Sequence, residues 1–334
     1  MDQLNLTLRE TDSPVPAPSW QVEDLIDEAA VPGQHPTATT RLGGELIARR
    51  ERSLWGDAWR RLIRNKLAIV GLLIVALFAI IAILAPVIAP YTQAEVVDHR
   101  LARIPPSWSW PMGLDANGRD MFSRMVYGAQ VSLVVGVLSQ AIVLLIGVPL
   151  GAAAGFLGGT ADNVLMRLVD VIYAIPQLLM VLLFVNWWGP GLFNIFLAIG
   201  LVGWVTEARL VRGQFLSLRE QEYVSAAQVA GGRPSYIIRK HMLPNSLTPI
   251  IVALTFGIPT AIFTEAALSF VGVGIRPPQA SWGQMVAEGS KPGYITTDPH
   301  MLLFPVLAIG LTMLGFTFLG DGLRDALDPK GNRN

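Results

Sequence analysis

The stretch that decides the fold is residues 67–89, LAIVGLLIVALFAIIAILAPVIA, which contains no charged side chain. A helix needs about 20 mostly apolar residues to cross the hydrocarbon core of a membrane. A helix on the core of a soluble protein keeps a polar stripe, and this segment has none. It therefore predicts a membrane-spanning helix.

The composition of the whole chain supports this prediction. Of the 334 residues, 52% are hydrophobic and 15% are charged, whereas soluble domains carry about 25% charged residues. The net charge is zero, with 25 basic and 25 acidic residues, which argues against nucleic-acid binding. The chain has no cysteine, which excludes disulfides, Cys-ligated zinc and iron–sulfur clusters. The four histidines are scattered, so we predict no metal site.

Further runs with few charges predict five more spans. We expect an all-α membrane protein whose six transmembrane helices cover residues 67–89, 130–156, 164–187, 191–211, 248–273 and 301–320. The sequence WWGPG at 187–191 separates the third span from the fourth. Pro149, Pro176 and Pro259 lie within spans and should kink their helices.

The basic residues predict the orientation. If the N-terminus lies inside, 19 of the 25 Lys and Arg residues fall on the inner side and six on the outer side. Inner loops of membrane proteins carry the excess of positive charge. We therefore expect a multi-pass protein of a prokaryotic inner membrane with both termini, including residues 321–334, in the cytoplasm. Trp108, Trp110 and Trp282 in the two outer loops, 90–128 and 274–300, are expected to be interface anchors.

Two segments precede the first span. Residues 1–48 hold eight acidic and two basic residues and predict a mostly disordered cytoplasmic tail. Within this tail, the apolar residues of 22–29 follow a helical period. The pattern indicates either a short docking helix or a chance arrangement in a linker. Residues 49–66 place Trp and Leu opposite Arg and Lys, which predicts an elbow helix in the membrane interface. An ordinary basic flank is the alternative.

The longest inner connection is residues 212–247, between the fourth and fifth spans. Gly231 and Gly232 should end one short helix, Pro234 should start another, and Pro244 should halt it. A two-helix element of this kind could transmit a movement of a partner protein to the two spans that it joins. The alternative is a plain connector between the spans, which would show the same pattern.

This loop resembles the EAA loop of ABC-importer permeases. The match is Ala226 and Ala227, three residues, Gly231, nine residues, and then HMLP at 241–244. The Glu of the family pattern is replaced by Ser225, and Glu222, one turn earlier, is the alternative. His241 is usual in the dipeptide/oligopeptide branch. Residues 113–124, 265–274 and 319–329 also resemble the C-type permease of that branch, so the resemblance covers about 50–330 in order.

The resemblance implies a type I ABC-importer permease fold and a division of labour. A second permease, two ATPase subunits and an extracytoplasmic peptide-binding protein would be the partners, besides membrane lipids. ATP and magnesium would bind only the ATPases, because this chain lacks G-x-x-x-x-G-K-[ST] and is expected to be non-catalytic. The coupling residues implied are Glu222, Ala226, Ala227, Gly231, His241, Leu243 and Pro244.

Polar and small residues inside the spans are the other candidates. Glu265, alone in the fifth span, should face the transport path or the second permease. Arg167 and Asp170 are three residues apart and are expected to pair, either structurally or as substrate contacts. Glu207 and Arg209 fall at the end of the fourth span, where snorkelling explains them. The repeat Gly147, Gly151, Gly155 and Gly159 predicts close helix packing, with a contact between permeases as one candidate location.

A secondary transporter or channel is the alternative function. That class typically shows matching halves with broken helices, and no clear inverted repeat is present. Within the resemblance the substrate stays open among peptides, nickel chelates, glutathione-like molecules and modified sugars.

Overall fold

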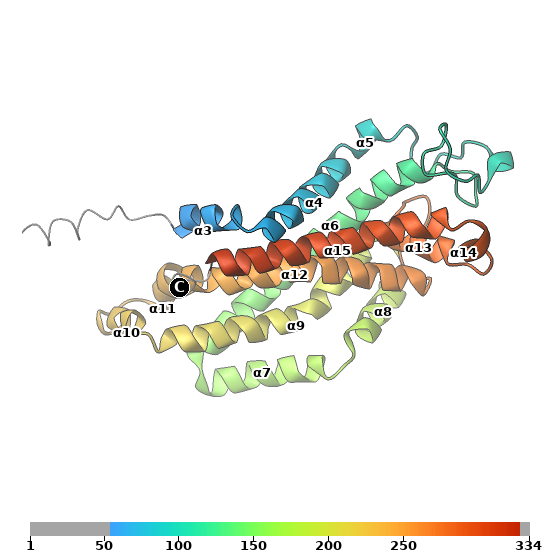
Figure 1. Ribbon diagram of the computed structural model, residues 1–334. Coiled ribbons are helices and arrows are strands. Elements are labelled where there is room, and N and C mark those ends of the chain that lie inside the picture. The colour runs from blue at the N-terminus through green and yellow to red at the C-terminus, as the bar shows by residue number, and fades with distance from the viewer. Residues whose placement is uncertain (1–53, 328–334) are drawn as a thin grey trace, which may run out of the picture. The chain divides into compact units, whose positions relative to one another are not determined.

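The computed structural model describes residues 54–327 (Figure 1). The chain divides into two units after Arg52, and every described residue belongs to the second unit. The predicted tail 1–48 with its periodic segment 22–29, the start of the elbow at 49–53 and the last residues 328–334 lie outside the described residues.

The described residues are helical, apart from turns, loops and a single β-bridge between Leu114 and Asp120. The helices are α3 (Leu54–Leu62), α4 (Lys66–Ile83), α5 (Ala85–Ile88), α6 (Met121–Leu157), α7 (Gly159–Tyr173), α8 (Gln177–Trp188), α9 (Leu192–Arg219), α10 (Glu222–Val229), α11 (Pro234–Ile237), α12 (Leu243–Phe270), α13 (Trp282–Gly289), α14 (Tyr294–Thr297) and α15 (His300–Leu327).

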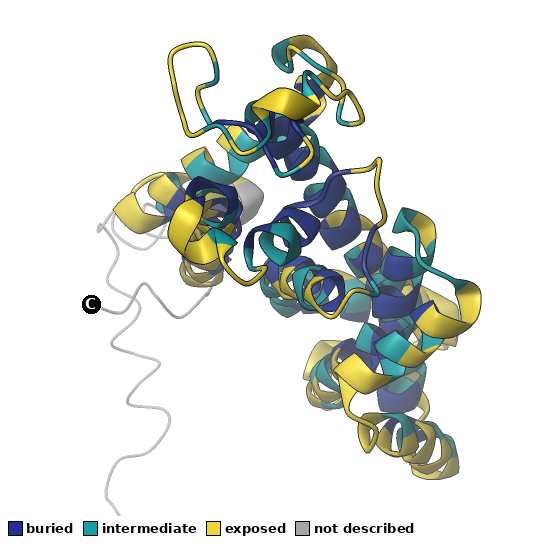
Figure 2. Cartoon of the chain, turned by 90° about the vertical axis from the view of Figure 1, so that its right-hand side faces the viewer, coloured by how far each residue is buried: buried dark blue, intermediate teal, exposed yellow. Residues whose placement is uncertain are grey.

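The prediction of an all-α membrane protein is confirmed. Helices α4, α6, α9, α12 and α15 are each long and apolar enough to cross a membrane, and the bent pair α7–α8 makes a sixth span if it is counted as one. Leu73 of α4, Val171 of α7 and Leu183 of α8 are exposed although they are apolar, as side chains that contact lipid are. Figure 2 shows exposed residues on the outer sides of the helices.

The predicted third span, 164–187, is broken rather than continuous. Helices α7 and α8 meet at an angle of 80°, and Pro176 is the N-cap of α8 with an extended backbone. A proline restricts the residue before it to non-helical conformations and offers no N–H to the preceding turn. Pro176 therefore separates two helices, whereas Pro149 and Pro259 lie inside α6 and α12.

The glycine repeat packs two helices of this chain together. A Cβ at Gly147 would lie 2.9 Å from Glu207 Cβ, one at Gly151 2.8 Å from Val211 Cβ, and one at Gly155 2.8 Å from the Arg212 carbonyl oxygen. These contacts are all with α9, so the predicted contact between permeases is wrong for these positions.

Gly159, the last member of the predicted repeat, does not take part in this packing. Helix α6 ends at Leu157, Gly158 has a φ of 65°, and a Cβ at Gly159 would meet nothing within 4 Å. The repeat in the sequence therefore continues past the end of the helix that uses it.

The first and last long helices form a second close pair. A Cβ at Gly71 would lie 2.8 Å from Phe318 Cβ of α15. Helix α3 packs on the same end of α15, where Ala58 and Leu62 form a buried cluster with Ala326. Trp59 is exposed on α3, as a side chain that contacts the membrane interface would be.

Trp282 is not the interface anchor that the sequence predicts. It is fully buried and its ring packs edge-on against Phe78, with 5.2 Å between ring centroids. Its indole N–H donates to the Met125 carbonyl at 3.0 Å. The side chain therefore joins α13 to α4 and α6, whereas Trp108 of the other loop is fully exposed.

Candidate functional site

The predicted coupling loop forms a compact two-helix element at one end of the bundle, here called the coupling end (Figure 1). Val224 of α10 is buried together with Phe215 of α9, Ile237 of α11 and Met242, and Ile250 of α12 belongs to the same cluster. Because one apolar cluster includes residues of α9, α10, α11 and α12, the short helices are attached firmly to two long ones.

The predicted tight turn between the short helices is confirmed. Gly231 has a φ of 79°, a conformation that glycine adopts without steric cost. The Gly231 N–H donates to the Gln228 carbonyl at 3.0 Å and the Gly232 N–H donates to the Ala227 carbonyl at 2.9 Å. A Cβ at residue 232 would lie 2.7 Å from the Ala227 carbonyl oxygen, so this turn requires a glycine at that position.

Pro234 starts α11 as predicted, but Pro244 does not halt the second helix. A π-helical turn, Ile238–Met242, leads directly into α12, and the Leu243 N–H donates to the Ile238 carbonyl. This wider turn places Pro244 in the first turn of α12, where a missing N–H costs little. Residues 234–270 therefore form one continuous helical segment that connects the coupling end to a membrane span.

The surface of the loop combines small, apolar and basic side chains. Glu222, Ala226 and Gly231 are exposed, and Ala227 is half-buried against the cluster. Val229 is 90% exposed although it is apolar. Arg233, Arg239 and Lys240 are also exposed.

His241, Leu243 and Pro244 lie beside this surface. The His241 ring contacts the rings of Tyr223 and Tyr236, with centroids 6.2 and 5.6 Å away. Leu243 is half-buried in the apolar cluster, and Pro244 is exposed. The two tyrosines were not predicted as site residues. Aromatic residues at the ends of the two short helices are the sequence signal that would have indicated them.

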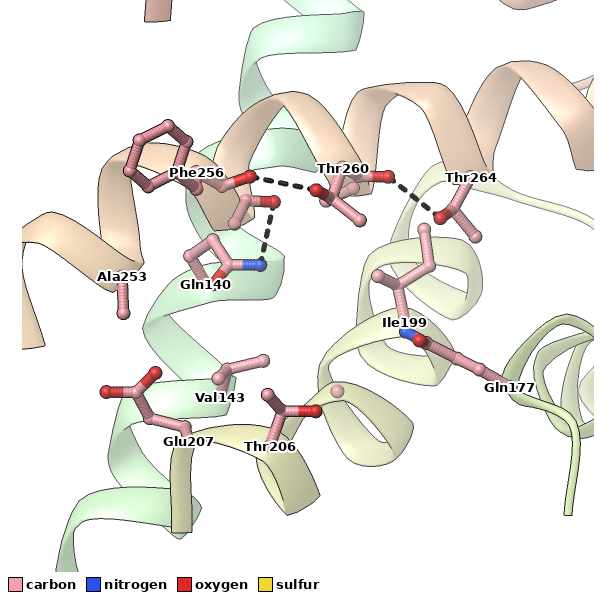
Figure 3. A pocket seen from close by; sticks show the side chains of 13 residues that line it. Gln140, Val143, Gln177, Ile199, Thr206, Glu207, Ala253, Phe256, Thr260 and Thr264 are labelled. Atoms are coloured by element: carbon pink, nitrogen blue, oxygen red, sulfur yellow. Dashed lines mark hydrogen bonds between the residues drawn. The ribbon is translucent and has the colours of Figure 1, made fainter. Parts of the chain in front are cut away.

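A groove of about 300 Å³ lies between α6, α8, α9 and α12 (Figure 3). Its polar lining side chains come from four helices and its apolar ones include Val143, Ile199 and Phe256. The polar set is Gln140, Gln177, Thr206, Glu207, Thr260 and Thr264.

Glu207 is the one charged residue of this groove, and snorkelling does not describe it. Helix α9 continues for three turns beyond it to Arg219, and its exposed fraction is only 7%. Its Oε1 has no hydrogen-bond partner among the described residues. Gly203, Thr206 and Glu207 are three and four residues apart, which places them on one helical face. This spacing could have indicated from the sequence that Glu207 shares a face with small and polar residues, which the charge pattern alone did not indicate.

The expected pair between Arg167 and Asp170 is wrong. Asp170 accepts a hydrogen bond of 2.7 Å from Arg209 of α9, and Arg167 is exposed. Asp162 accepts two bonds from Arg212, of 2.5 and 2.7 Å. A partner on a neighbouring helix competes with an i, i+3 neighbour, and the bidentate geometry of arginine favours it. These two ion pairs hold α7 against α9.

Glu265 faces neither a path nor an outer surface in this structure. It is fully buried within the chain, and its Oε1 accepts hydrogen bonds from Ser269 at 2.8 Å and Ser281 at 2.7 Å. A Cβ at Gly283 would lie 3.0 Å from its other oxygen. The expected contact with a pathway or a second permease is therefore corrected to a contact between α12 and the start of α13.

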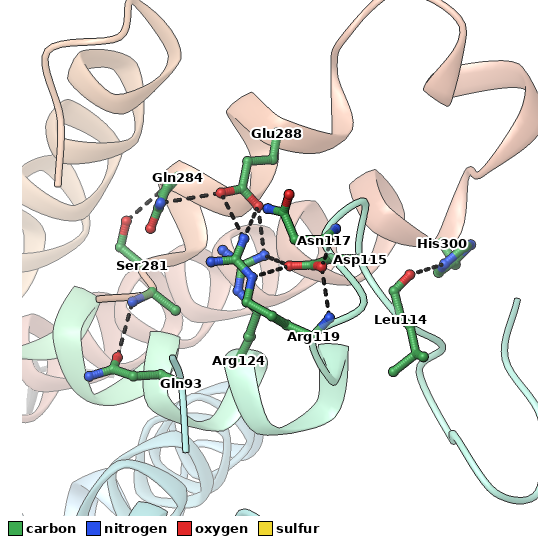
Figure 4. A network of polar contacts seen from close by, with 11 residues as sticks. Gln93, Leu114, Asp115, Asn117, Arg119, Arg124, Ser281, Gln284, Glu288 and His300 are labelled. Atoms are coloured by element: carbon green, nitrogen blue, oxygen red, sulfur yellow. Dashed lines mark hydrogen bonds and ion pairs between the residues drawn. The ribbon is translucent and has the colours of Figure 1, made fainter. Parts of the chain in front are cut away.

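A network of buried charges lies at the opposite end of the bundle, between the loop that precedes α6 and α13 (Figure 4). Asp115 Oδ2 accepts from Arg119 at 2.7 Å and from Arg124 at 2.6 Å. Glu288 of α13 accepts from Arg124 at 2.6 Å and from Gln284 at 3.2 Å. The stretch 113–124 thus serves to fix the loop to α13.

Comparison with known families gives two matches. Residues 147–333 match the family described as the binding-protein-dependent transport system inner membrane component. Residues 53–106 match the N-terminal transmembrane domain of oligopeptide transport permease C. The two matches include the elbow helix, the first span, the coupling loop and the last span.

Relatives similar over most of the chain include the oligopeptide transport system permease protein OppC of Bacillus subtilis, 44% identical over 88% of this chain and 96% of that protein. The dipeptide transport system permease protein DppC of the same organism is 46% identical over 83% of this chain and 86% of its own length. The glutathione transport system permease protein GsiD of Pectobacterium atrosepticum is 40% identical over 84% of this chain and 92% of its own length.

Among solved structures, the MetNI methionine ABC transporter in an inward-facing conformation contains a similar chain. The TM-score is 0.51 at 21% identity, over 62% of this chain and 97% of that one. This similarity supports the fold of the helical bundle.

Proposed function

Since this chain belongs to the family of binding-protein-dependent transport system inner membrane components, we infer that it is the permease subunit of an ATP-driven importer of dipeptides and oligopeptides. It is a non-catalytic, multi-pass component of a bacterial inner membrane. Peptides are the proposed substrates because the relatives that match nearly the whole chain are named for oligopeptide and dipeptide transport. The family leaves the alternative of a self-sufficient secondary transporter without support.

The proposed partners follow from the family and from the coupling end. An ATPase and a binding protein are implied by binding-protein-dependent transport. We assign two ATPase subunits to the coupling end, a second permease beside this one, and the binding protein to the opposite end. The excess of Lys and Arg on the inner side supports a cytoplasmic coupling end with both termini on that side.

The observation that carries the proposal is the joint anchoring of the two-helix element. Exposed Ala226 and Val229 offer a small, partly apolar surface for an ATPase. Behind them, Val224 and Ala227 pack on the cluster that includes Phe215 of α9 and Ile250 of α12. Because α9 and α12 also line the groove, a displacement of α10 moves the two groove walls. ATP hydrolysis in the partner subunits would supply that displacement, a shift between two packings.

The test is a bulky substitution on the exposed face of α10. We expect Ala226→Trp in the complete importer, reconstituted with its ATPases and binding protein, to reduce ATP-driven tri-alanine uptake by about tenfold or more. A large side chain in a close-packed interface keeps the partner surface away. Binding-protein-stimulated ATP hydrolysis and ATPase co-purification are measured in parallel.

The matched control is Ala94→Trp, an exposed alanine in the loop at the opposite end. It should leave ATPase co-purification unchanged. Normal uptake by the Ala226→Trp complex would show that this face of α10 does not receive the ATPase.

A further inference from the structure

We propose that the groove between α6, α8, α9 and α12 is a recognition site in the transport path, where the Glu207 carboxylate receives the positively charged amino terminus of the peptide. This inference rests on the proposed function as a peptide importer. Neither the family matches nor the coupling loop assigns a role to the Glu207 carboxylate.

Placing the Glu207 carboxylate at this position costs free energy. An ionised carboxylate without a partner is expensive in an apolar environment, and ionisable residues inside membrane spans mark functional paths by default. Glu207 lies in a span and lines the groove, and its Oε1 lacks a hydrogen-bond partner among the described residues. Its Cβ packs where Gly147 makes room for it, so the side chain is held at the groove wall.

The arginines closest to Glu207 in the sequence are already paired with other carboxylates. Arg209 and Arg212 follow Glu207 on the same helix, but they point to α7. They bind Asp170 at 2.7 Å and Asp162 at 2.5 Å. Arg209 also lies over the Tyr173 ring, 4.0 Å from its centroid. No Lys, Arg or His is among the described residues that line the groove, so the charge of Glu207 is left for a ligand.

Three of the other polar side chains of the groove present hydrogen-bond acceptors. Thr260 donates its hydroxyl proton to the Phe256 carbonyl and Thr264 donates to the Thr260 carbonyl, both at 2.8 Å (Figure 3). The Gln140 amide donates to the Gly257 carbonyl at 3.1 Å. The two threonine hydroxyls have used their only donor on the backbone and present oxygen acceptors, and the Gln140 amide, with one of its two N–H groups used, keeps an oxygen acceptor. The groove therefore favours a ligand rich in N–H donors with one positive charge.

A primary ammonium group at the end of a peptide satisfies both requirements. It brings three donors and a positive charge, and the neighbouring backbone amides bring further N–H donors. Glu265 also has one oxygen, Oε2, without a hydrogen-bond partner among the described residues, but Ser269 and Ser281 bond its other oxygen and the residue is fully buried. Of the two carboxylates, only Glu207 lines a groove.

The experiment uses the complete importer in proteoliposomes, with ATPases, second permease and binding protein. Glu207→Gln keeps the shape of the side chain and removes its charge. We expect tri-alanine uptake to fall by about tenfold or more, because a charge-assisted hydrogen bond is replaced by a weaker one. Binding-protein-stimulated ATP hydrolysis should stay within about twofold of wild type. Asp325→Asn, an exposed carboxylate on α15, is the matched control and should transport normally.

A second peptide separates the two sources of positive charge. The amino terminus is the only positive charge of tri-alanine, whereas Ala-Lys-Ala adds a cationic side chain. If Glu207→Gln lowers uptake of both peptides, the amino terminus is recognised as proposed. Normal tri-alanine uptake by this variant would overturn the proposal, whether or not Ala-Lys-Ala uptake falls. If the wild-type complex imports neither peptide, the proposed function itself fails, which is a distinct result.

Chemical modification gives an independent readout, because the chain contains no natural cysteine. In Glu207→Cys, a negatively charged methanethiosulfonate reagent should restore part of the tri-alanine uptake and a positively charged one should not. The wild-type complex treated with both reagents controls for cysteines of the partner subunits. Equal effects of the two reagents would contradict the proposal. If neither variant assembles with its partners, Glu207 is a structural residue and the proposal is also overturned.

Discussion

Replacing Asp115 with asparagine tests whether the buried charge network holds the loop that precedes α6 in place. Asp115 is fully buried, and one of its oxygens receives bonds of 2.7 and 2.6 Å from Arg119 and Arg124. In the variant an amide group, with its own N–H donors, faces two guanidinium groups. Removing one partner of a buried pair costs about 3–5 kcal/mol, because it leaves charge uncompensated. Glu288 still contacts both arginines, so we expect a loss near the lower bound, about 3 kcal/mol.

The assay is equilibrium unfolding of the purified chain in lipid, followed by tryptophan fluorescence, together with the rate of proteolysis between residues 97 and 120. The control is Arg103→Gln, which removes an ion pair of 3.4 Å with Asp298 in which the arginine side chain is 49% exposed. An exposed pair contributes about 0–1 kcal/mol. If Asp115→Asn lowers the free energy of unfolding no more than Arg103→Gln does, the network is not what holds the loop.

Two further substitutions test the packing of the bundle by the same unfolding measurement. Gly151→Ala should destabilise the chain by about 1–3 kcal/mol, because its Cβ would lie 2.8 Å from Val211 Cβ. The control is Gly310→Ala, which should cause no loss because its Cβ would meet nothing within 4 Å. Equal losses of stability in the two variants would refute the close α6–α9 contact. Trp282→Phe should lower the free energy of unfolding by about 1–3 kcal/mol, because the buried Met125 carbonyl loses its donor. The control is Trp108→Phe, at a fully exposed position, which should leave the stability unchanged. An equally large loss of stability in Trp108→Phe would contradict the role assigned to Trp282.

Local patterns in the sequence predicted the elements that depend on local chemistry. The uncharged run at 67–89 holds all of α4, Lys66–Ile83, except its first residue, and the short α5 follows within the same run, because a helix that crosses a membrane needs a long apolar segment. Gly231, Gly232 and Pro234 produce the predicted turn because their backbone preferences act within a few residues. These features need no information about distant parts of the chain.

Contacts between distant segments were the part that the sequence could not specify. Asp170 has a near neighbour of opposite charge in the sequence, yet it binds Arg209, which is 39 residues away. Glu265 has Ser269 one helical turn away as a partner, but its second donor, Ser281 at the start of α13, comes from another element. Both outcomes depend on which helices pack together, and helix periodicity leaves that choice open.

Pro244 and Pro176 show the same limit for backbone breaks. The two residues have the same local preference, but the π turn ahead of Pro244 lets the helix continue, whereas α7 and α8 separate at Pro176 with an 80° bend. Glu207 was misread for a related reason. Its helix extends further than the apolar run suggested, and this extension places the carboxylate inside the groove.

The central claim is that α10 receives the ATPase, and a cross-link from Ala226 tests it most directly. The chain has no cysteine, so Ala226→Cys introduces a single reactive site on the exposed face of α10. In the assembled importer, a short thiol-reactive photo-cross-linker at this site should join the chain to an ATPase subunit. A cross-link only to the second permease or to the binding protein, in a complex that still hydrolyses ATP, would contradict the account.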